Sequence, residues 1–283
     1  MAEAQPIFRF APSPNGLLHR GHALSALANQ RFAQETGGRL LLRIEDIDPQ
    51  RSRPEFEAAI RRDLAWLDIG FDGEVLRQSQ RMPLYQAALD RLRERGLVYG
   101  CTCSRQDIRV EIERRERGTG RPWPRDPDEV PLYPGTCRDK DIEGNAVWRL
   151  RMEAGIAAAG RDLSYLRFDE AGTQTVIATD PARWGDVVLA RRDVPTSYHL
   201  SVAVDDAAQG VTHVVRGRDL EAATDIHLLL QRLLGLATPR YHFHRLLQDE
   251  GGQKLAKSRG SLSLADLREG GLTAEALREE LGF

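Results

Sequence analysis

The first 46 residues restrict the fold more than any other part of the chain, because strand-like and helix-like patterns alternate there. "IFRFA" (7–11) is a short apolar run that favours a strand, and "RLLLRIED" (39–46) is typical of a buried strand. Between them, "HALSALANQRFAQ" (22–34) spaces its apolar residues at helical intervals. Strand, helix and strand in this order predict a βαβ unit, and therefore an α/β fold with a parallel sheet.

The loop before this helix has the properties of a phosphate-binding segment. In a βαβ unit a ligand binds at the carboxyl ends of the strands, against the positive N-terminus of the helix. Gly21 allows a ligand to approach the backbone, and the imidazoles of His19 and His22 can donate hydrogen bonds to phosphate oxygens. The alternative is a surface loop that happens to carry two histidines. The segment has neither the Gly-Lys-Ser/Thr of a Walker A loop nor Gly-x-Gly-x-x-Gly, so a nucleotide site needs a lysine from elsewhere.

A lysine pair of the required kind occurs near the end of the chain. "GGQKLAKSRG" (251–260) places Lys254 and Lys257 before Ser258, in a segment that glycines flank. Lysines are good partners for phosphates, and flanking glycines allow a loop to close over a ligand. A basic surface turn is the alternative for this segment alone. The histidine pair and the lysine pair are each a weak signal, but together they indicate a nucleotide site.

The charge balance limits the classes of partner. Forty basic residues against 42 acidic ones give a formal net charge of −2, which argues against a protein that coats DNA. Two segments, 91–96 and 108–125, are locally rich in arginine and are typical of solvated helix faces. The absence of a long apolar run and of a signal peptide predicts a cytoplasmic protein without a membrane segment.

The three cysteines are clustered, at positions 101, 103 and 137. An odd number argues against a disulfide framework, and Cys-x-Cys with a returning third cysteine favours a structural zinc site over three buried thiols. Zinc takes four ligands, and no histidine lies between residues 101 and 198. Tyr133 is the nearest candidate for the fourth ligand. Its rivals are Asp126, Asp128 and Glu129.

The rest of the chain suggests how the domains are organised. Helices are predicted at 53–70, 83–96 and 223–236, strand-like runs over 186–220, a strand at 241–249 and two short helices at the C-terminus. A change to a proline-rich composition predicts that the region from Cys101 to about residue 180 is an inserted module. The predicted nucleotide-binding domain therefore comprises residues 1–100 and 181–260, the zinc-bearing insertion residues 101–180, and the C-terminal helices residues 261–283.

The two signatures, "LLHRGH" and "KLAKS", resemble those of class I aminoacyl-tRNA synthetases. More narrowly, "RFAPSPNGLLHRGH", "LLRIEDIDPQR", "PTSYHLSVAVDD" and "THVVRGRDL" resemble the glutamyl-tRNA synthetase family, and the match extends over nearly the whole chain. The resemblance implies a Rossmann-type catalytic domain, split by an insertion that handles the tRNA acceptor end in relatives.

The positions at which the sequence departs from the family pattern indicate which subgroup of the family it resembles. Members that charge tRNA with glutamate continue far beyond the lysine segment into a helical anticodon-binding domain, whereas only residues 259–283 follow it here. The "RGRDL" segment also departs, because relatives usually continue with an acidic residue, histidine, leucine and an asparagine, where this chain has Leu220, Glu221 and Ala223. These features and the cysteine module resemble short paralogues. Such enzymes activate L-glutamate with ATP and esterify it to the queuosine base at the wobble position of tRNA(Asp).

The resemblance also implies roles for individual residues. Arg9 and Ser13 hold the side-chain carboxylate of glutamate, Glu45 takes its ammonium, and Tyr198 and Arg216 complete the pocket. ATP is bound with Mg²⁺ as a substrate. The residues implied in ATP binding and catalysis are His19, Gly21, His22, Lys254, Lys257 and Ser258, and the zinc ligands are Cys101, Cys103, Tyr133 and Cys137.

Other functions remain open at the level of the sequence. One is a minimal glutamyl-tRNA synthetase that charges a tRNA 3′ end, another is a synthetase-derived RNA-binding or regulatory protein without catalysis, and a third is a small-molecule nucleotidyltransferase. We expect a monomer that binds the anticodon stem-loop of tRNA(Asp) through arginines and exposed aromatic residues. Trp123 and Trp148 are candidates for such contacts, although buried core positions are the alternative for both.

Overall fold

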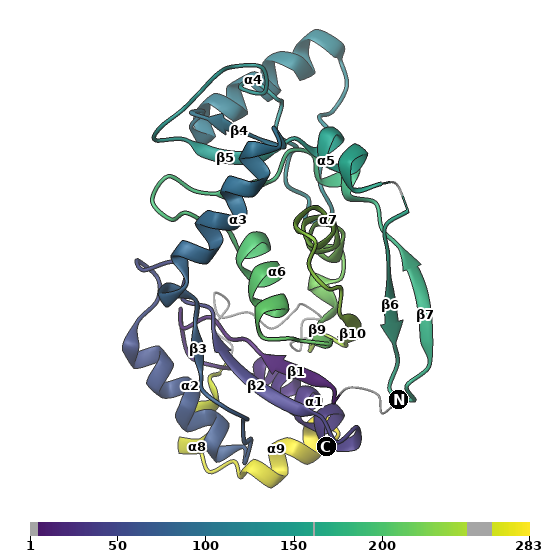
Figure 1. The fold of residues 1–283 in the computed structure, drawn as a ribbon. Coiled ribbons are helices and arrows are strands. Elements are labelled where there is room, and N and C mark those ends of the chain that lie inside the picture. The colour runs from purple at the N-terminus through teal and green to yellow at the C-terminus, as the bar shows by residue number, and fades with distance from the viewer. Residues whose placement is uncertain (1–4, 161, 248–261) are drawn as a thin grey trace.

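A computed structural model describes residues 5–160, 162–247 and 262–283 of the chain. Parallel strands and their helices form the body of the molecule, and a small antiparallel sheet with a long helix lies at one end of it (Figure 1). The predicted α/β alternation around a parallel sheet is therefore confirmed.

The N-terminal half of the body contains the predicted βαβ unit. Its elements are β1 (Ile7–Phe10), α1 (Arg20–Glu35), β2 (Arg39–Ile44), α2 (Pro54–Trp66) and the short β3 (Leu76–Arg77). β2 lies between β1 and β3 and is parallel to both. The residues of β2 are buried from Leu40 to Ile44, as is typical of a central strand in a parallel sheet, and the charged Arg43 is among them.

The second half of the body adds strands from much later in the chain. They are β6 (Ser164–Phe168), β7 (Gln174–Ala178), β9 (His213–Gly217) and β10 (Arg240–His244), in the order β7-β6-β10-β9. β10 is parallel to β9 and β6, and β7 is an antiparallel edge strand. The amide of Thr212 donates to the carbonyl of Ile7 at 3.0 Å, so β9 lies beside β1. β6 and β7 thus join this sheet, although their residues fall within the segment 101–180.

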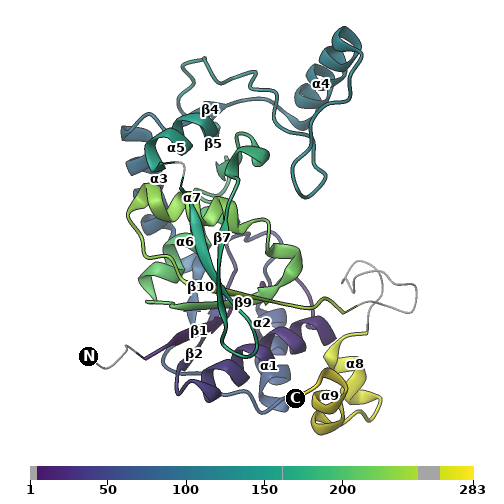
Figure 2. The ribbon, with the colours of Figure 1, turned by 90° about the vertical axis from the view of Figure 1, so that its right-hand side faces the viewer.

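The antiparallel sheet supports the cysteine-bearing region. Its strands are β4 (Val98–Cys101), β5 (Val147–Leu150) and β8 (Val188–Ala190), and the nearby helices are α3 (Met82–Glu94), α4 (Arg105–Thr119) and α5 (Met152–Ala159). α4 buries only Ile112, and Glu111 pairs with Arg114 and Arg115 at 2.7 Å. The arginine-rich segment is therefore a solvated helix face, and it projects on the same side of the molecule as α8 (Figure 2).

One prediction of secondary structure is wrong. Residues 195–207 have a strand-like pattern, but they contain most of helix α6 (Tyr198–Ala208). Ser197 caps the helix by accepting a hydrogen bond from the amide of Leu200. Because α6 is buried on several sides, two adjacent carboxylates, Asp205 and Asp206, are buried as well as its apolar residues, and no exposed polar stripe marks the helical period.

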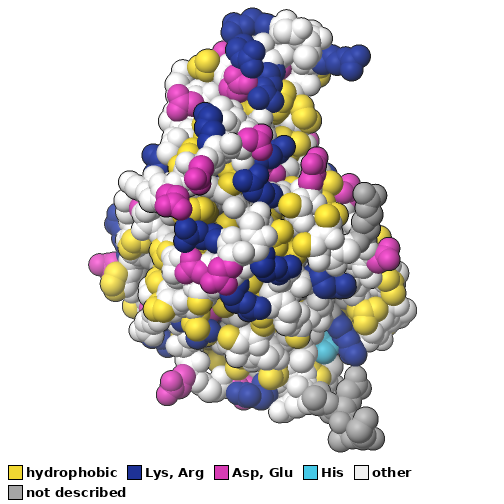
Figure 3. Space-filling model, turned by 45° about the horizontal axis from the view of Figure 1, so that its top comes forward, with side chains coloured by type: hydrophobic (Ala, Val, Ile, Leu, Met, Phe, Trp, Pro, Cys, Tyr) yellow, Lys and Arg dark blue, Asp and Glu magenta, His cyan; other side chains and the backbone are white. Residues whose placement is uncertain are grey.

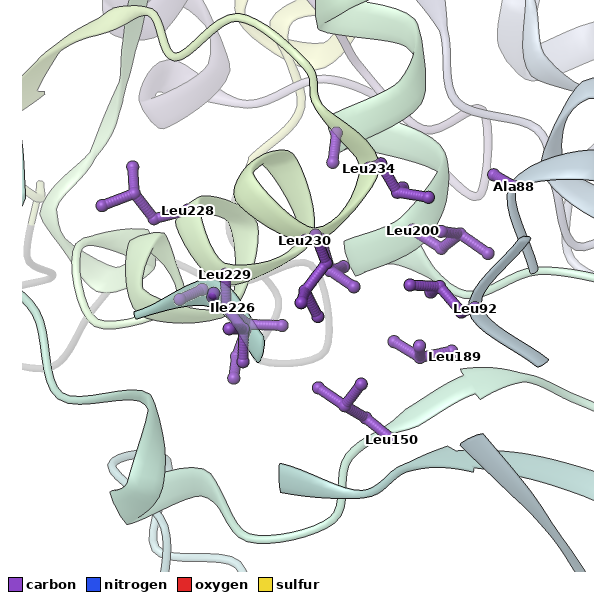
Figure 4. Packing of buried hydrophobic residues seen from close by; sticks show 14 of the residues in the cluster. Ala88, Leu92, Leu150, Leu189, Leu200, Ile226, Leu228, Leu229, Leu230 and Leu234 are labelled. Carbon is purple, nitrogen blue, oxygen red and sulfur yellow. The ribbon is translucent and has the colours of Figure 1, made fainter. Parts of the chain in front are cut away.

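The core of the body is organised around α7 (Thr224–Leu234), the helix predicted at 223–236. Leu229 and Leu230 are fully buried, and Leu230 points toward side chains from α3, α6 and the antiparallel sheet (Figure 4). The other α7 residues labelled in Figure 4 are Ile226, Leu228 and Leu234. This packing connects the parallel body with the cysteine-bearing end.

The C-terminal residues form the two predicted short helices, α8 (Leu264–Glu269) and α9 (Ala274–Leu281). Leu264 and Leu277 are fully buried in the same apolar cluster as Leu27 of α1. The amide of Leu264 donates to the carbonyl of Leu18 at 2.8 Å, so the chain returns to the loop in front of α1. None of the described helices has the length and apolar character needed to span a bilayer.

Candidate functional site

A cavity of about 560 Å³ lies where β1, β2, β9 and β10 end. This is the edge at which parallel α/β sheets bind ligands. The cavity collects residues from the N-terminal loop, from β2, from α6 and from β9. The predicted site residues that line it are Arg9, Ser13, His19, Gly21, His22, Glu45, Tyr198 and Arg216.

The two histidines of the loop cap helix α1. The Nδ1 atom of His19 accepts from the amide of Gly21, and the Nδ1 atom of His22 accepts from the amide of His19, each at 3.1 Å. Because Nδ1 accepts in both rings, the hydrogen of each neutral imidazole is on Nε2. The ring centroids are 3.9 Å apart. The helix cap thus fixes the tautomer of both rings and places them together at the positive end of the helix.

Close packing against His19 is a second reason for glycine at position 21, in addition to the predicted approach of a ligand to the backbone. A Cβ atom at this position would lie 3.0 Å from Cε1 and 3.1 Å from Nδ1 of the His19 ring. Any side chain there would therefore displace the imidazole that caps the helix. The absence of a side chain allows His19 to fold back over the first turn.

The predicted lysine segment cannot be compared with these residues, because Lys254, Lys257 and Ser258 lie outside the described part of the chain. Its described neighbours can be placed. Leu247 lines the cavity, and Ser263 forms an isolated β-bridge with His19. Residues that precede and follow the segment therefore lie at the candidate site.

A buried network of charges supports the floor of the cavity. Asp206 of α6 accepts from the Nε atom of Arg9 at 3.1 Å and from a terminal nitrogen of Arg43 at 2.6 Å. Both arginines are almost fully buried. Burial alone would raise the pKa of Asp206, but the charges of Arg9 and Arg43 hold it below its ordinary value. Asp206 is therefore an anion shared by two cations.

Glu45 is the most strongly perturbed carboxyl group that lines the cavity. Its carboxylate lies 3.6 Å from the Nε atom of Arg43, and its side chain is 10% exposed. Burial raises the pKa of Glu45 to about 7, although the charges of Arg43 and Arg9 act in the opposite direction. A cationic ligand group beside Glu45 would favour the ionised form and would restore the charge that burial disfavours.

Sequence reasoning missed the buried partners of the predicted residues. Asp206, Arg43 and His227 do not follow from a local pattern, because each contacts a residue far away in the sequence or on another element. The adjacent carboxylates in "VAVDDA" were the one available signal. Acidic residues in an otherwise apolar segment are buried only with partners.

The three cysteines form a cluster at the end of β4, outside the cavity. Their Sγ atoms lie within 4.8 Å of one another, and no described aspartate, glutamate or histidine joins this group. The hydroxyl of Tyr133 is 3.2 Å from the Sγ atom of Cys101 and 3.6 Å from that of Cys103. Three sulfurs and one phenol oxygen thus converge, which fits the four ligands and tetrahedral preference of zinc.

The predicted rivals of Tyr133 are placed differently. The carboxylate of Asp126 accepts from the amides of Asp128 and Val130 at 2.9 Å and closes a turn.

The thiol of Cys137 has a perturbed pKa. Burial by itself would raise its pKa, but hydrogen bonds from the Tyr133 hydroxyl and the Thr102 backbone lower the pKa to about 6. Thiolate is the form that binds metal.

Comparisons with known proteins identify the family. Residues 7–282 match the family described as tRNA synthetases class I (E and Q), catalytic domain. A protein of Rhodobacter capsulatus named glutamyl-Q tRNA(Asp) synthetase is 48% identical over 98% of this chain and 100% of its own length. A glutamate–tRNA ligase 2 of Nitrosococcus oceani is 37% identical over 95% of this chain but only 57% of its own length.

Solved structures agree in fold. A glutamate tRNA ligase from Elizabethkingia meningosepticum superposes with a TM-score of 0.69 at 24% identity, over 95% of this chain. The present chain spans 53% of that protein. The Rossmann-type fold that the sequence predicts is therefore confirmed. Since the family match covers nearly every residue of the chain, the protein belongs to the class I tRNA synthetases of the E and Q group.

Proposed function

We propose that the protein activates L-glutamate with ATP and transfers the glutamyl group to the queuosine base at the wobble position of tRNA(Asp). One observation carries the first half of the proposal: the residues expected to hold glutamate and the histidines expected to hold ATP line one cavity. The acceptor is supported by two relatives named glutamyl-Q tRNA(Asp) synthetase, from Rhodobacter capsulatus at 48% identity and from Albidiferax ferrireducens at 40%.

The proposed roles follow from the charges in the cavity. Glutamate has two carboxylates and one ammonium, so its pocket needs cations and one anion. Among the described residues no hydrogen bond uses the terminal nitrogens of Arg9, which suit a carboxylate because a guanidinium can bind it with two donors. Ser13 assists Arg9, Glu45 binds the ammonium, and Tyr198 and Arg216 complete the pocket.

The chemistry requires charge stabilisation and needs no nucleophilic side chain. The α-carboxylate of glutamate attacks the α-phosphorus of ATP, and pyrophosphate leaves. The Nε2–H groups of His19 and His22 donate to phosphate oxygens as negative charge develops. By resemblance to the family, Lys254 and Lys257 act on the β- and γ-phosphates, and Mg²⁺ accompanies ATP.

We also propose that Cys101, Cys103, Tyr133 and Cys137 hold one structural zinc ion. The ion would fix the loop that contains Tyr133 and Cys137 to strand β4. Arg149 stacks on the ring of Tyr133, with its Cζ atom 3.9 Å from the ring centroid, and the backbone oxygen of Asp186 accepts from Arg149 at 2.9 Å. The site is therefore connected to the segment that leads into β8.

The RNA surface is proposed to include the end of the molecule that carries α4. Cationic side chains extend from α4 across the face shown in Figure 3, with acidic side chains between them. Trp123 and Trp148 are half-buried and carry arginines on their rings, Arg115 at 5.4 Å and Arg93 at 4.1 Å. An unpaired anticodon base is the kind of RNA target that arginines and aromatic side chains can recognise.

The test of the proposed function has two stages. Glutamate-dependent exchange between ATP and pyrophosphate measures activation, and Arg9→Leu should lower it by several orders of magnitude. Labelled glutamate is then offered to tRNA(Asp) with queuosine, to tRNA(Asp) without it, and to tRNA(Glu). Transfer to the first RNA alone is expected. Transfer to tRNA(Glu) would instead indicate a synthetase that charges the 3′ end, and a lack of exchange would contradict activation altogether.

A further inference from the structure

Two histidines on neighbouring helices continue the candidate glutamate pocket into the protein. His227 of α7 is 2% exposed, and its Nδ1 atom lies 3.0 Å from a terminal nitrogen of Arg216. Its Nε2 atom lies 3.2 Å from the Nδ1 atom of His199 on α6. His199 in turn lines a separate cavity of about 800 Å³ beside the cysteine-bearing region. A chain of three side chains thus connects two cavities.

The arginine fixes where the hydrogens lie in this chain. A guanidinium only donates hydrogen bonds, so the Nδ1 atom of His227 must accept. His227 is then neutral with its hydrogen on Nε2, and this hydrogen is donated to the Nδ1 atom of His199. Burial and the charge of Arg216 favour neutral rings, since they lower the pKa of His199 to about 4 and that of His227 well below its ordinary value.

The hydrogen-bond partners of Arg216 are neutral. Its second terminal nitrogen donates to the hydroxyl of Thr224 at 2.8 Å, and the rings of Tyr241 and Phe243 lie 5.4 and 5.6 Å from its Cζ atom. Within the described residues Arg216 forms no ion pair with a carboxylate, and its buried Nε atom has no hydrogen-bond partner. Arg9, by contrast, shares Asp206.

This difference has a consequence for ligand binding. A carboxylate beside Arg216 would orient it but would also cancel its charge, and it would compete with an anionic ligand. A neutral imidazole orients the guanidinium and leaves the charge intact. We propose that His227, which donates its Nε2 hydrogen to His199, is a positioning residue that holds Arg216 for a carboxylate of the amino-acid substrate. The substrate named here rests on the proposed function.

Substitution of His227 by glutamine and by leucine tests the positioning role. Glutamine offers Oε1 to accept from Arg216 and Nε2 to donate to His199, whereas leucine offers neither. Leu228→Ala is the matched control, because Leu228 is a buried apolar residue of the same helix and has no side-chain hydrogen bond to lose (Figure 4). The Michaelis constants for glutamate and for ATP are measured by ATP–pyrophosphate exchange.

His227→Leu should raise the constant for glutamate about tenfold or more, as expected for the loss of a hydrogen bond to a charged group, and should leave the constant for ATP within about twofold. His227→Gln should stay within about threefold of the parent, and Leu228→Ala should change neither constant. If His227→Leu and His227→Gln change the Michaelis constant for glutamate equally, or if His227→Leu does not change it, His227 does not position Arg216. His199→Leu, with a smaller expected rise for glutamate, replaces His227→Leu if that variant does not fold.

A second readout is independent of the reaction. ¹⁵N-resolved imidazole spectra of the protein at neutral pH should assign both rings as neutral with hydrogen on Nε2, and His227→Gln should alter the signals of His199. A charged ring or hydrogen on Nδ1 of His227 would overturn the proposal even in an active enzyme. The parent protein could show the expected spectra but no glutamate-dependent exchange. That result would contradict the proposed substrate, but it would not contradict the tautomers assigned to His227 and His199.

Discussion

Glutamine in place of Glu45 should change the pH dependence of glutamate binding. The buried carboxyl has a pKa of about 7, so about 10% of the protein has an ionised Glu45 at pH 6 and about 90% at pH 8. Only the ionised form can pair with the ammonium of glutamate. The apparent dissociation constant should therefore be about ten times larger at pH 6 than at pH 8, because the binding-competent fraction sets it.

Calorimetric titration of glutamate without ATP, at pH values from 6 to 8, measures this dependence. Glu45→Gln should bind more weakly at pH 8 and should lose most of the variation with pH, because glutamine does not ionise. A parent protein whose affinity is constant over this range would show that the carboxyl is already ionised at pH 6. Equal pH dependence in both proteins would show that another group is responsible.

Glu45→Gln should weaken glutamate binding but increase the stability of the ligand-free protein. The pKa of Glu45 is higher in the folded protein than its ordinary value of 4.5, so the folded protein binds more protons than the unfolded chain between about pH 4.5 and 7. Stability is then lost as the pH rises through this window, by about 3 kcal/mol in total. Urea denaturation at pH 8 should find the ligand-free Glu45→Gln variant more stable than the parent.

Three further predictions concern the site and its support. Asp206→Asn leaves two buried arginines with a weaker partner and should lower the free energy of unfolding by about 3 kcal/mol in urea denaturation. Gly21→Ala places a Cβ atom 3.0 Å from the ring of His19 and should slow ATP–pyrophosphate exchange about 10- to 100-fold, while the melting temperature changes little. Leu229→Ala should cost about 2–5 kcal/mol of stability but should leave the Michaelis constant for glutamate unchanged, because the residue is fully buried away from the cavity.

The zinc proposal has its own test, in the protein purified without added metal. Stoichiometric zinc and a lower melting temperature after chelation are expected, since metal binding to a folded site adds to stability. Cys137→Ser should lose the metal, whereas Tyr133→Phe should retain it with lower affinity because three thiolates remain. A metal content near zero with an unchanged melting temperature would show that the four side chains are a buried cluster of thiols and a phenol.

Much of the fold follows from short-range patterns. The βαβ unit, the amphipathic helices and the two C-terminal helices are read from periodicity, and their observed limits differ from the predicted ones by a few residues. Helix α6 was missed because its environment hides its period: Leu200 and Ala203 face the core, and Asp205 and Asp206 are also buried. Burial on several sides removes the polar stripe by which a helix is recognised.

The histidine loop was predictable from its own residues, whereas the amino-acid pocket was predictable only where the resemblance named the residue. Arg9 and Glu45 stand in recognisable segments, whereas the partners that hold them come from tertiary structure. Asp206 lies 197 residues after Arg9 in the sequence, and His227 is on a helix that periodicity assigns to the core. A carboxylate or an imidazole at such a position has no local pattern, because its partner belongs to another element.

The charges around the cavity suggest why glutamate should be preferred to glutamine. Arg9, Arg216 and Arg245 line the cavity together with Glu45 and Asp219, and the buried pair of Arg43 and Asp206 supports its floor. With an ionised Glu45, these groups carry four formal positive charges and three negative ones. The single excess positive charge is balanced by glutamate, whose net charge is negative, but not by glutamine, which is neutral overall. Glutamine would also leave a buried guanidinium without its carboxylate, a mismatch that typically lowers kcat/KM for the wrong substrate by about 10⁴-fold or more. Exchange assays with both amino acids should therefore show a difference in kcat/KM of about this size, and a difference below about tenfold would refute the charge argument.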